Sequence, residues 1–168
     1  MRKINFIGFS IALVGFCQVL SGCGTDPADG GSSGGVIAVG GAGTGSIGFG
    51  SPQRLIPGRS ATTQYRTDIW TVSLTTGAPV TLLLCRTGTV SFDPYLSIHG
   101  PGGSTDNVQT DDDSAGMLGS RIVFTPTTTG RHTIYTSTFS SFTSSDSAAG
   151  SYRLTVTAGA MMTATCPN

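Results

Sequence analysis

The sequence contains no glutamate, and Lys3 is its only lysine. Charged residues make up 11% of the 168 residues, and nine basic and nine acidic side chains balance at pH 7. Glu and Lys suit helices and are depleted in strands, so their scarcity favours an all-β chain. A neutral chain with scattered arginines also lacks the basic patch of nucleic-acid-binding proteins, so we expect no nucleic-acid partner.

The four cysteines do not show a C-x-x-C spacing, so they give no indication of a zinc site. Cys17 lies in the apolar N-terminal segment, and Cys23 follows directly after it. Cys85 and Cys166 can form a disulfide if the chain is exported, because disulfides persist in oxidising compartments. The alternative is that both are free buried thiols.

The N-terminus carries the features of an export signal. Two basic residues precede an apolar run over residues 4–20, and the small residues Ser21 and Gly22 follow it. The alternative is an uncleaved membrane-spanning helix, for which the run has about the minimum length. The sequence Leu20-Ser21-Gly22-Cys23 resembles the lipobox of bacterial lipoproteins. The resemblance implies a signal peptide over residues 1–22 and a lipid on Cys23.

A lipid on Cys23 implies a definite location. Two or more acyl chains anchor a protein stably, so the resemblance makes the membrane a partner. Gly24 follows the cysteine, which resembles the pattern of outer-membrane lipoproteins. We therefore expect a protein of the cell envelope, lipid-anchored in the outer membrane and either periplasmic or exposed at the surface.

Residues 23–52 are rich in Gly, Ser and Ala, and such a composition predicts a flexible tether. Gly43, Gly45 and Gly48 match the G-x-G-x-x-G fingerprint of dinucleotide-binding turns. That site also needs a helix after the glycines to face the pyrophosphate, and the following Phe49-Gly50-Ser51-Pro52 does not predict one. We therefore interpret the segment as a spacer, followed by a lead-in over residues 53–67.

The remainder predicts an antiparallel, jelly-roll-like β-sandwich of about seven to eight strands. Apolar and polar residues alternate in short segments separated by Gly, Pro or Asp turns. The predicted strands are residues 68–75, 79–86, 95–99, 107–110, 120–125, 131–137 and 150–157. A domain over residues 68–157 follows, with residues 158–168 as a C-terminal tail.

Several short motifs in this region together resemble the bacterial pre-peptidase C-terminal domain. They are, in order, Asp68 with Trp70, Val72 and Leu74, then Gly77, Phe92-Asp93-Pro94-Tyr95-Leu96, Asp112-Asp113, Gly130 and Gly150-Ser151-Tyr152-Arg153-Leu154. The resemblance implies a non-catalytic accessory β-sandwich, associated with secretion, adhesion or the binding of carbohydrate or protein. His132 departs from the family pattern, which has an aromatic residue there, and no protease domain precedes the motifs.

Asp93, Asp111 and Asp113 are the candidate metal ligands. Ca²⁺ prefers several carboxylate and carbonyl oxygens, and strand pairing could bring Asp93 near the aspartates at residues 111–113. The alternative is that each aspartate caps a turn by accepting backbone N–H bonds. Apart from this possible calcium, we expect no cofactor.

Phe139 and Phe142 are the candidate binding residues, because they lie in a Ser-rich loop between two predicted strands. Exposed aromatic residues on loops commonly anchor sugars or proteins, so a polysaccharide or protein ligand is expected. The alternative is that one ring folds back on the sandwich. Without a G-x-S-x-G elbow, we expect no hydrolase activity. The sequence therefore predicts a non-catalytic, surface-anchored binding or structural module, or alternatively an accessory to a separately encoded extracellular hydrolase.

Overall fold

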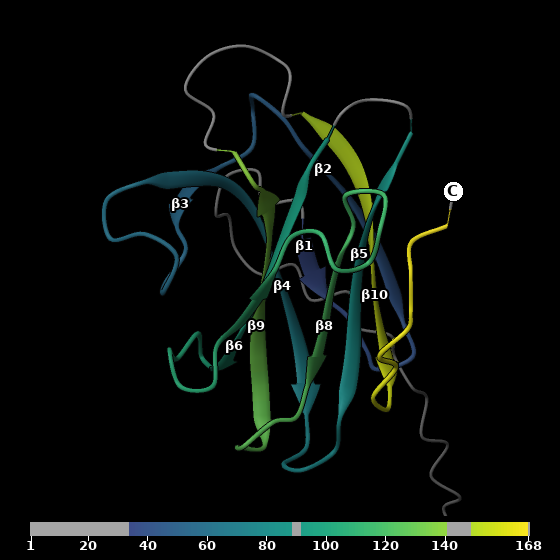
Figure 1. The fold of residues 1–168 in the computed structure, drawn as a ribbon. Coiled ribbons are helices and arrows are strands. Elements are labelled where there is room, and N and C mark those ends of the chain that lie inside the picture. The colour runs from purple at the N-terminus through teal and green to yellow at the C-terminus, as the bar shows by residue number, and fades with distance from the viewer. Residues whose placement is uncertain (1–33, 89–91, 141–148, 168) are drawn as a thin grey trace, which may run out of the picture.

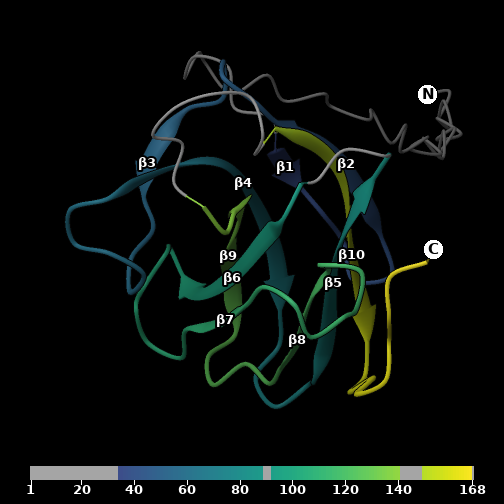
Figure 2. The ribbon, with the colours of Figure 1, turned by 45° about the horizontal axis from the view of Figure 1, so that its top comes forward.

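The computed structural model describes residues 34–88, 92–140 and 149–167, and these form two packed β-sheets (Figures 1 and 2). The described part contains no helix, so none of it is a helix long and apolar enough to cross a membrane. The all-β sandwich expected from the sequence is confirmed. The strands are β1 (Gly34–Val36), β2 (Ala42–Ile47), β3 (Gln53–Leu55), β4 (Gln64–Leu74), β5 (Val80–Thr87), β6 (Pro94–Pro101), β7 (Gln109–Asp111), β8 (Ser120–Phe124), β9 (Gly130–Thr138) and β10 (Gly150–Ala158).

The two sheets contain six and four strands. The larger has the order β1-β4-β9-β6-β7, with β3 paired to the start of β4, and the smaller has the order β2-β10-β5-β8. All pairs are antiparallel except β1 with β4, which is parallel. Seven of the strands, β4 to β10, correspond to the seven predicted from alternation.

A single large apolar core fills the space between the sheets. Alternate residues of each strand point inward, as the period of two dictates, and most of the core side chains are fully buried. The cluster comprises Ile37, Ile47, Trp70, Val72, Leu74, Val80, Leu82, Leu84, Phe92, Leu96, Ile98, Ile122, Phe124, Ile134, Tyr152, Leu154 and Val156. Since Ile37 and Ile47 belong to it, the core begins well before the predicted domain boundary at residue 68.

The flexible tether predicted over residues 23–52 is therefore wrong from Gly34 onward. Strand β1 pairs with the middle of β4, and β2 pairs with the whole length from Gly150 to Thr155. The glycines of the apparent dinucleotide fingerprint lie in β2 and the turn after it. Residues 23–33 lie outside the described residues.

The physical reason is that the glycines of β2 let its backbone lie directly on large core side chains. A Cβ at Gly43 would come within 2.3 Å of the Trp70 ring, and one at Gly45 within 2.3 Å of the Tyr152 hydroxyl. A Gly-rich composition predicts a flexible segment because its own side chains bury little apolar surface. Here the space of the missing side chains is filled by the Trp70 indole from the facing sheet and by the Tyr152 phenol from the neighbouring strand β10.

Beneath β2, Tyr152 ties the two sheets together through a buried polar network. Its hydroxyl donates to Asp68 Oδ2 at 2.6 Å and accepts from Trp70 Nε1 and Thr136 Oγ1, each at 2.9 Å. Burial, and then the hydrogen bond to Asp68, raises the pKa of Tyr152 far above its ordinary value. The phenol therefore stays protonated and holds the donor role that the buried carboxylate requires.

The predicted lead-in and tail also belong to the folded unit. Strand β4 starts at Gln64, inside the lead-in, and β3 pairs with it. The tail returns along the smaller sheet, where Arg121 Nη1 donates to Ala164 O at 2.8 Å. A disulfide joins Cys166 to Cys85 on β5 with a Cα–Cα distance of 5.4 Å, so the two cysteines expected to pair do pair.

Candidate functional site

The candidate site lies where β9 ends and β6 begins. Phe139 follows β9, Asp93 precedes β6, and the Phe139 N–H donates to Asp93 O at 2.9 Å. The Phe139 side chain is 50% exposed. The candidate aromatic residue and one of the candidate carboxylates, separated in sequence, are thus brought together by the pairing of β6 with β9.

Burial and the carboxylates of Asp113 and Asp112 raise the pKa of Asp93. Burial has the largest effect, and the charges of the two neighbouring aspartates raise the pKa further. Its Oδ1 atom is buried and has no hydrogen-bond partner in the described part of the chain. The loop after β7 therefore places negative charge beside a carboxyl group that is already poorly solvated.

Asp111 has a different role from the one expected of a metal ligand. Its Oδ2 accepts from Ser114 N at 3.1 Å, Ser114 Oγ at 2.9 Å and Arg121 N at 2.7 Å. These are the contacts of the turn-capping alternative, because they satisfy backbone donors in the β7–β8 connection. The carboxylates whose charges act on Asp93 are Asp112 and Asp113, whereas the sequence had singled out Asp111 and Asp113.

The structure adds Arg59, which the sequence analysis did not identify. Its guanidinium carbon lies 3.6 Å from the ring centroids of both Tyr65 and Tyr95, and Nη1 donates to Thr138 O at 3.0 Å. Burial lowers the pKa of Arg59, while the tyrosines and Asp112 oppose that change. Arg59 therefore joins the β3–β4 loop to the end of β9 and brings a cation next to the aspartates.

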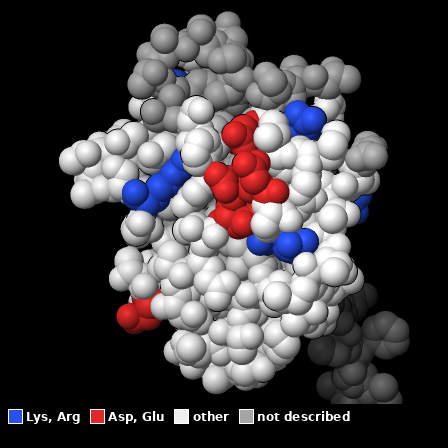
Figure 3. All heavy atoms as spheres, viewed as in Figure 1, with Lys and Arg blue, Asp and Glu red and all other residues white. Residues whose placement is uncertain are grey.

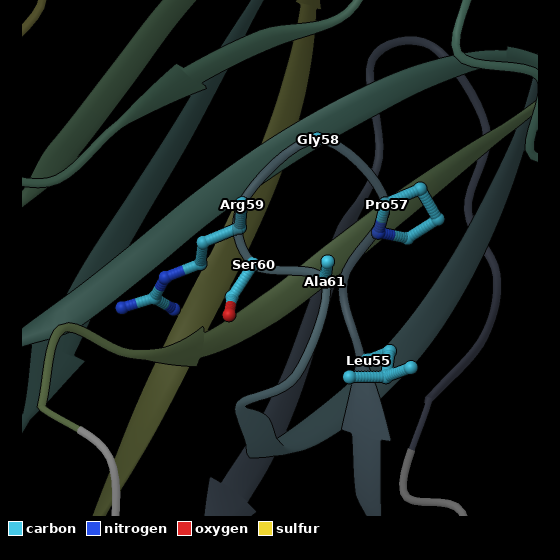
Figure 4. A pocket seen from close by; sticks show the side chains of 6 residues that line it. All are labelled: Leu55, Pro57, Gly58, Arg59, Ser60 and Ala61. Atoms are coloured by element: carbon cyan, nitrogen blue, oxygen red, sulfur yellow. The ribbon is translucent and has the colours of Figure 1, made fainter.

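The loop that carries Arg59 curves around an open hollow of about 490 Å³. It is lined by Leu55, Pro57, Gly58, Arg59, Ser60 and Ala61 (Figure 4). The Arg59 side chain extends away from the centre of the loop toward the tyrosines. The hollow itself therefore has a mainly apolar lining beside a charged rim.

We call Arg59, Asp93, Asp112, Asp113 and Phe139 the charged end of the sandwich. Figure 3 shows most of the visible acidic atoms gathered into one patch in the upper half of the face, with basic atoms on both sides of it and a separate acidic group at the lower left. A cation, two aromatic rings, an exposed phenylalanine and a carboxylate group thus meet on loops that a rigid sandwich holds. Such an arrangement can bind a polar ligand through charge and ring contacts.

Neither histidine supplies a catalytic group to this end. His99 Nε2 lies 2.6 Å from Ser97 Oγ, but both residues are completely buried, and burial lowers the pKa of His99. His132 is also buried, with its ring against Phe124. Within residues 34–88, 92–140 and 149–167, no group of three or more His, Cys or Asp side chains is placed to hold a metal ion.

Two of the predicted site residues, Cys23 and Phe142, lie outside the described residues. Arg59 was missed because it lies in the segment interpreted as a lead-in, and no local motif distinguishes it from the other arginines. Only the pairing of β9 with both β4 and β6, and of β3 with β4, brings Arg59, Tyr65 and Tyr95 together.

No protein-family model matches the chain, and no curated protein sequence does so either. Several solved structures are similar to it, among them the following two. The pre-peptidase C-terminal domain of a collagenase from Bacillus anthracis matches with a TM-score of 0.50 and 14% identity, over 77% of this chain and 99% of that one. CorA, a surface-associated copper-binding protein of Methylomicrobium album BG8, matches with a TM-score of 0.52 and 12% identity, over 76% and 98%.

These matches show the fold. The chain shares the β-sandwich of the pre-peptidase C-terminal domain, which supports the resemblance found in the sequence motifs. At 12–14% identity, the likeness concerns the β-sandwich alone.

Proposed function

We propose that this chain is a lipid-anchored, non-catalytic binding module of the cell envelope, and that the charged end is its ligand-binding surface. The observation that carries the proposal is the half-exposed Phe139, whose backbone N–H donates to Asp93 O and whose carbonyl oxygen accepts from Arg59 Nη2. Exposed aromatic residues beside fixed polar groups are typical anchors for sugars and for proteins. The ligand class is accordingly a polysaccharide or an envelope or matrix protein.

A binding array tests this function directly. The mature chain is applied to glycans and matrix proteins, together with the variants Phe139→Ala and Met162→Ala. Met162 is a matched control, because its side chain is 68% exposed and the residue follows β10, at the end of the sandwich opposite Phe139. Loss of binding in Phe139→Ala alone supports the proposal, whereas equal binding by all three proteins contradicts it.

Lipid anchoring at Cys23 is the second part of the proposal, and it rests on the lipobox. Growth with labelled palmitate should label the polypeptide, and Cys23→Ser should abolish the label and release the protein from membranes. An unlabelled wild-type chain would reject the anchor.

Calcium is the proposed ion of the charged end. Asp93 has a buried oxygen without a partner and lies near the charges of Asp112 and Asp113, so a cation would relieve an existing repulsion. Calorimetric titration with Ca²⁺ should give heat and raise the melting temperature. If the wild-type protein shows neither effect, calcium does not bind at the charged end.

An accessory role for a separately encoded extracellular hydrolase is the second candidate. The similarity to the pre-peptidase C-terminal domain of a collagenase favours it. Affinity purification from membranes separates the two functions, because an accessory module should retain a hydrolase, and a stand-alone binding module should retain none.

A further inference from the structure

The end of the sandwich opposite Phe139 and Asp93 contains four connections without a charged side chain. They are residues 37–41 between β1 and β2, 75–79 between β4 and β5, 125–129 between β8 and β9, and 159–163 after β10. We call this set the charge-free end. Two charged residues border this set at one side: Asp106, on the β6–β7 connection, lines one hollow with Thr127 and Thr128, and Arg131 lies at the start of β9.

Backbone hydrogen bonds tie these connections to one another and to the strands. Gly77 N donates to Pro126 O and Gly159 N donates to Pro79 O, each at 2.8 Å. Gly40 N donates to Val156 O at 2.7 Å, and Val156 lies on β10, the strand that leads into the fourth connection. The charge-free end is therefore one continuous, supported surface and not four independent loops.

Large apolar side chains are exposed at this end and on the strand that enters it. Val36 is 71% exposed, Val39 40%, Met161 47% and Met162 68%. Around them the surface is supplied mainly by Thr, Gly, Ala and Pro. Figure 3 shows the corresponding lower part of the visible face almost free of charged atoms.

We infer that the charge-free end rests on the bilayer that carries the acyl groups of Cys23. This inference rests on the lipid anchoring proposed above. Membrane-interface contacts combine apolar side chains with polar groups that tolerate the headgroup region, and a charged group carried below the headgroups is costly. The apolar side chains here are those of Val36, Val39, Met161 and Met162. The polar groups are the hydroxyls of the threonines within residues 75–76 and 125–129.

The position of the anchor favours the same contact. The described chain begins at Gly34, and β1 leads directly into the connection at residues 37–41. The ten residues 24–33 between Cys23 and Gly34 can span at most about 33–36 Å, so the domain stays close to its membrane. Asp93, Asp112 and Asp113 would be repelled from an anionic surface, which turns the charged end outward.

Tryptophan quenching by brominated lipids tests this orientation. The chain has one tryptophan, Trp70, which is buried and gives a constant background. Met162→Trp and Val39→Trp report on the charge-free end, and Phe139→Trp is the matched reporter at the charged end. The full mature chain, which begins at Cys23, is coupled through that thiol to a maleimide lipid in phosphatidylethanolamine–phosphatidylglycerol vesicles, with the disulfide intact.

Met162→Trp and Val39→Trp should lose about half of their added fluorescence in brominated vesicles, because interfacial side chains reach 5–10 Å into the headgroup boundary. Phe139→Trp should lose none. Quenching of Phe139→Trp instead, or of no reporter, would overturn the inference. Dimerisation through Met162 in place of quenching would assign this end to a second copy and overturn it too.

Coupling in vitro separates this inference from the proposed function. If palmitate does not label Cys23 in cells, the anchoring proposal fails, while the vesicle measurement still reports whether this end prefers a bilayer. A Met161→Asp, Met162→Asp double variant should remove the quenching of the Val39→Trp reporter and leave thermal stability unchanged. Full quenching in that variant would count against the contact.

Discussion

The two ends of the sandwich are built on the same strands but have opposite surfaces. At one end, Arg59, Asp93 and Asp112 bring charge next to aromatic rings. At the other, four hydrogen-bonded connections contain no charge and expose Val39, Met161 and Met162. The core therefore specifies the scaffold, and the connections give each end a different surface.

Two segments that the sequence had placed outside the domain run between these ends. Strand β2 leads away from the charge-free end toward the charged end, and the tail returns from Met161 to the disulfide at Cys85. Changes in these segments should therefore disturb the scaffold, and changes in the connections should disturb one end alone.

Removal of the disulfide should have the largest effect. The bond joins residues 81 positions apart, so a Cys85→Ser, Cys166→Ser variant should lose about 2–5 kcal/mol of unfolding free energy. Denaturant titration measures the loss. The vesicle contact of Met162 should weaken with it, while ligand binding at Phe139 should persist in the folded fraction. Unchanged stability would mean that the tail contributes nothing to the fold.

Gly45→Ala should cost about 1–3 kcal/mol, because the new Cβ would overlap the Tyr152 hydroxyl and strain the network with Asp68 and Trp70. Gly48→Ala is the matched control, since a Cβ there meets nothing within 4 Å. Thermal unfolding of the two variants measures the difference. Equal melting temperatures would show that β2 does not lie on Tyr152.

Arg59→Lys should weaken the charged end by about 1–2 kcal/mol, because an ammonium group cannot stack between Tyr65 and Tyr95 as the planar guanidinium does. Arg153→Lys, at an exposed position on β10, should be neutral within about 0.5 kcal/mol. Chemical denaturation and the binding array measure the two consequences. If Arg59→Lys leaves both the stability and the binding unchanged, the stacking of Arg59 on the two tyrosines does not contribute to the charged end.

Asp93→Asn should have the smallest effect on stability, and its sign should depend on pH. Burial and neighbouring charges raise the pKa of Asp93 above its usual 3.8, so the folded chain binds the proton more tightly than the unfolded chain. Wild-type stability should therefore fall as the pH rises through the window above 3.8. Without calcium, Asp93→Asn should melt at a higher temperature than wild type at pH 7.

That gain should vanish near pH 3, where the carboxyl is protonated in both the folded and the unfolded chain. Asp106→Asn is the control, because Asp106 is exposed in the β6–β7 connection. With calcium, the order of the melting temperatures at pH 7 should reverse if Asp93 is a ligand. A variant less stable than wild type at neutral pH without calcium would contradict the repulsion at this end.

Much of the scaffold could be predicted from the sequence. The alternation of apolar and polar residues located seven strands, since that period follows from strand geometry alone and is visible in residues such as Trp70, Val72 and Leu74. The export context of two late cysteines identified the pair Cys85 and Cys166. Both inferences depend on local chemistry or on a small number of candidates, so they need no knowledge of packing.

The tertiary structure decided which segments belong to the domain and which groups meet. Gly43 and Gly45 carry no side chain to reveal a strand, and only the opposing Trp70 and Tyr152 make them part of the core. The meeting of Arg59 with Tyr65, Tyr95 and Asp112 depends on strand order, which residue periodicity does not encode. The sequence determined what each strand buries, and the packing of the sheets determined what each end presents.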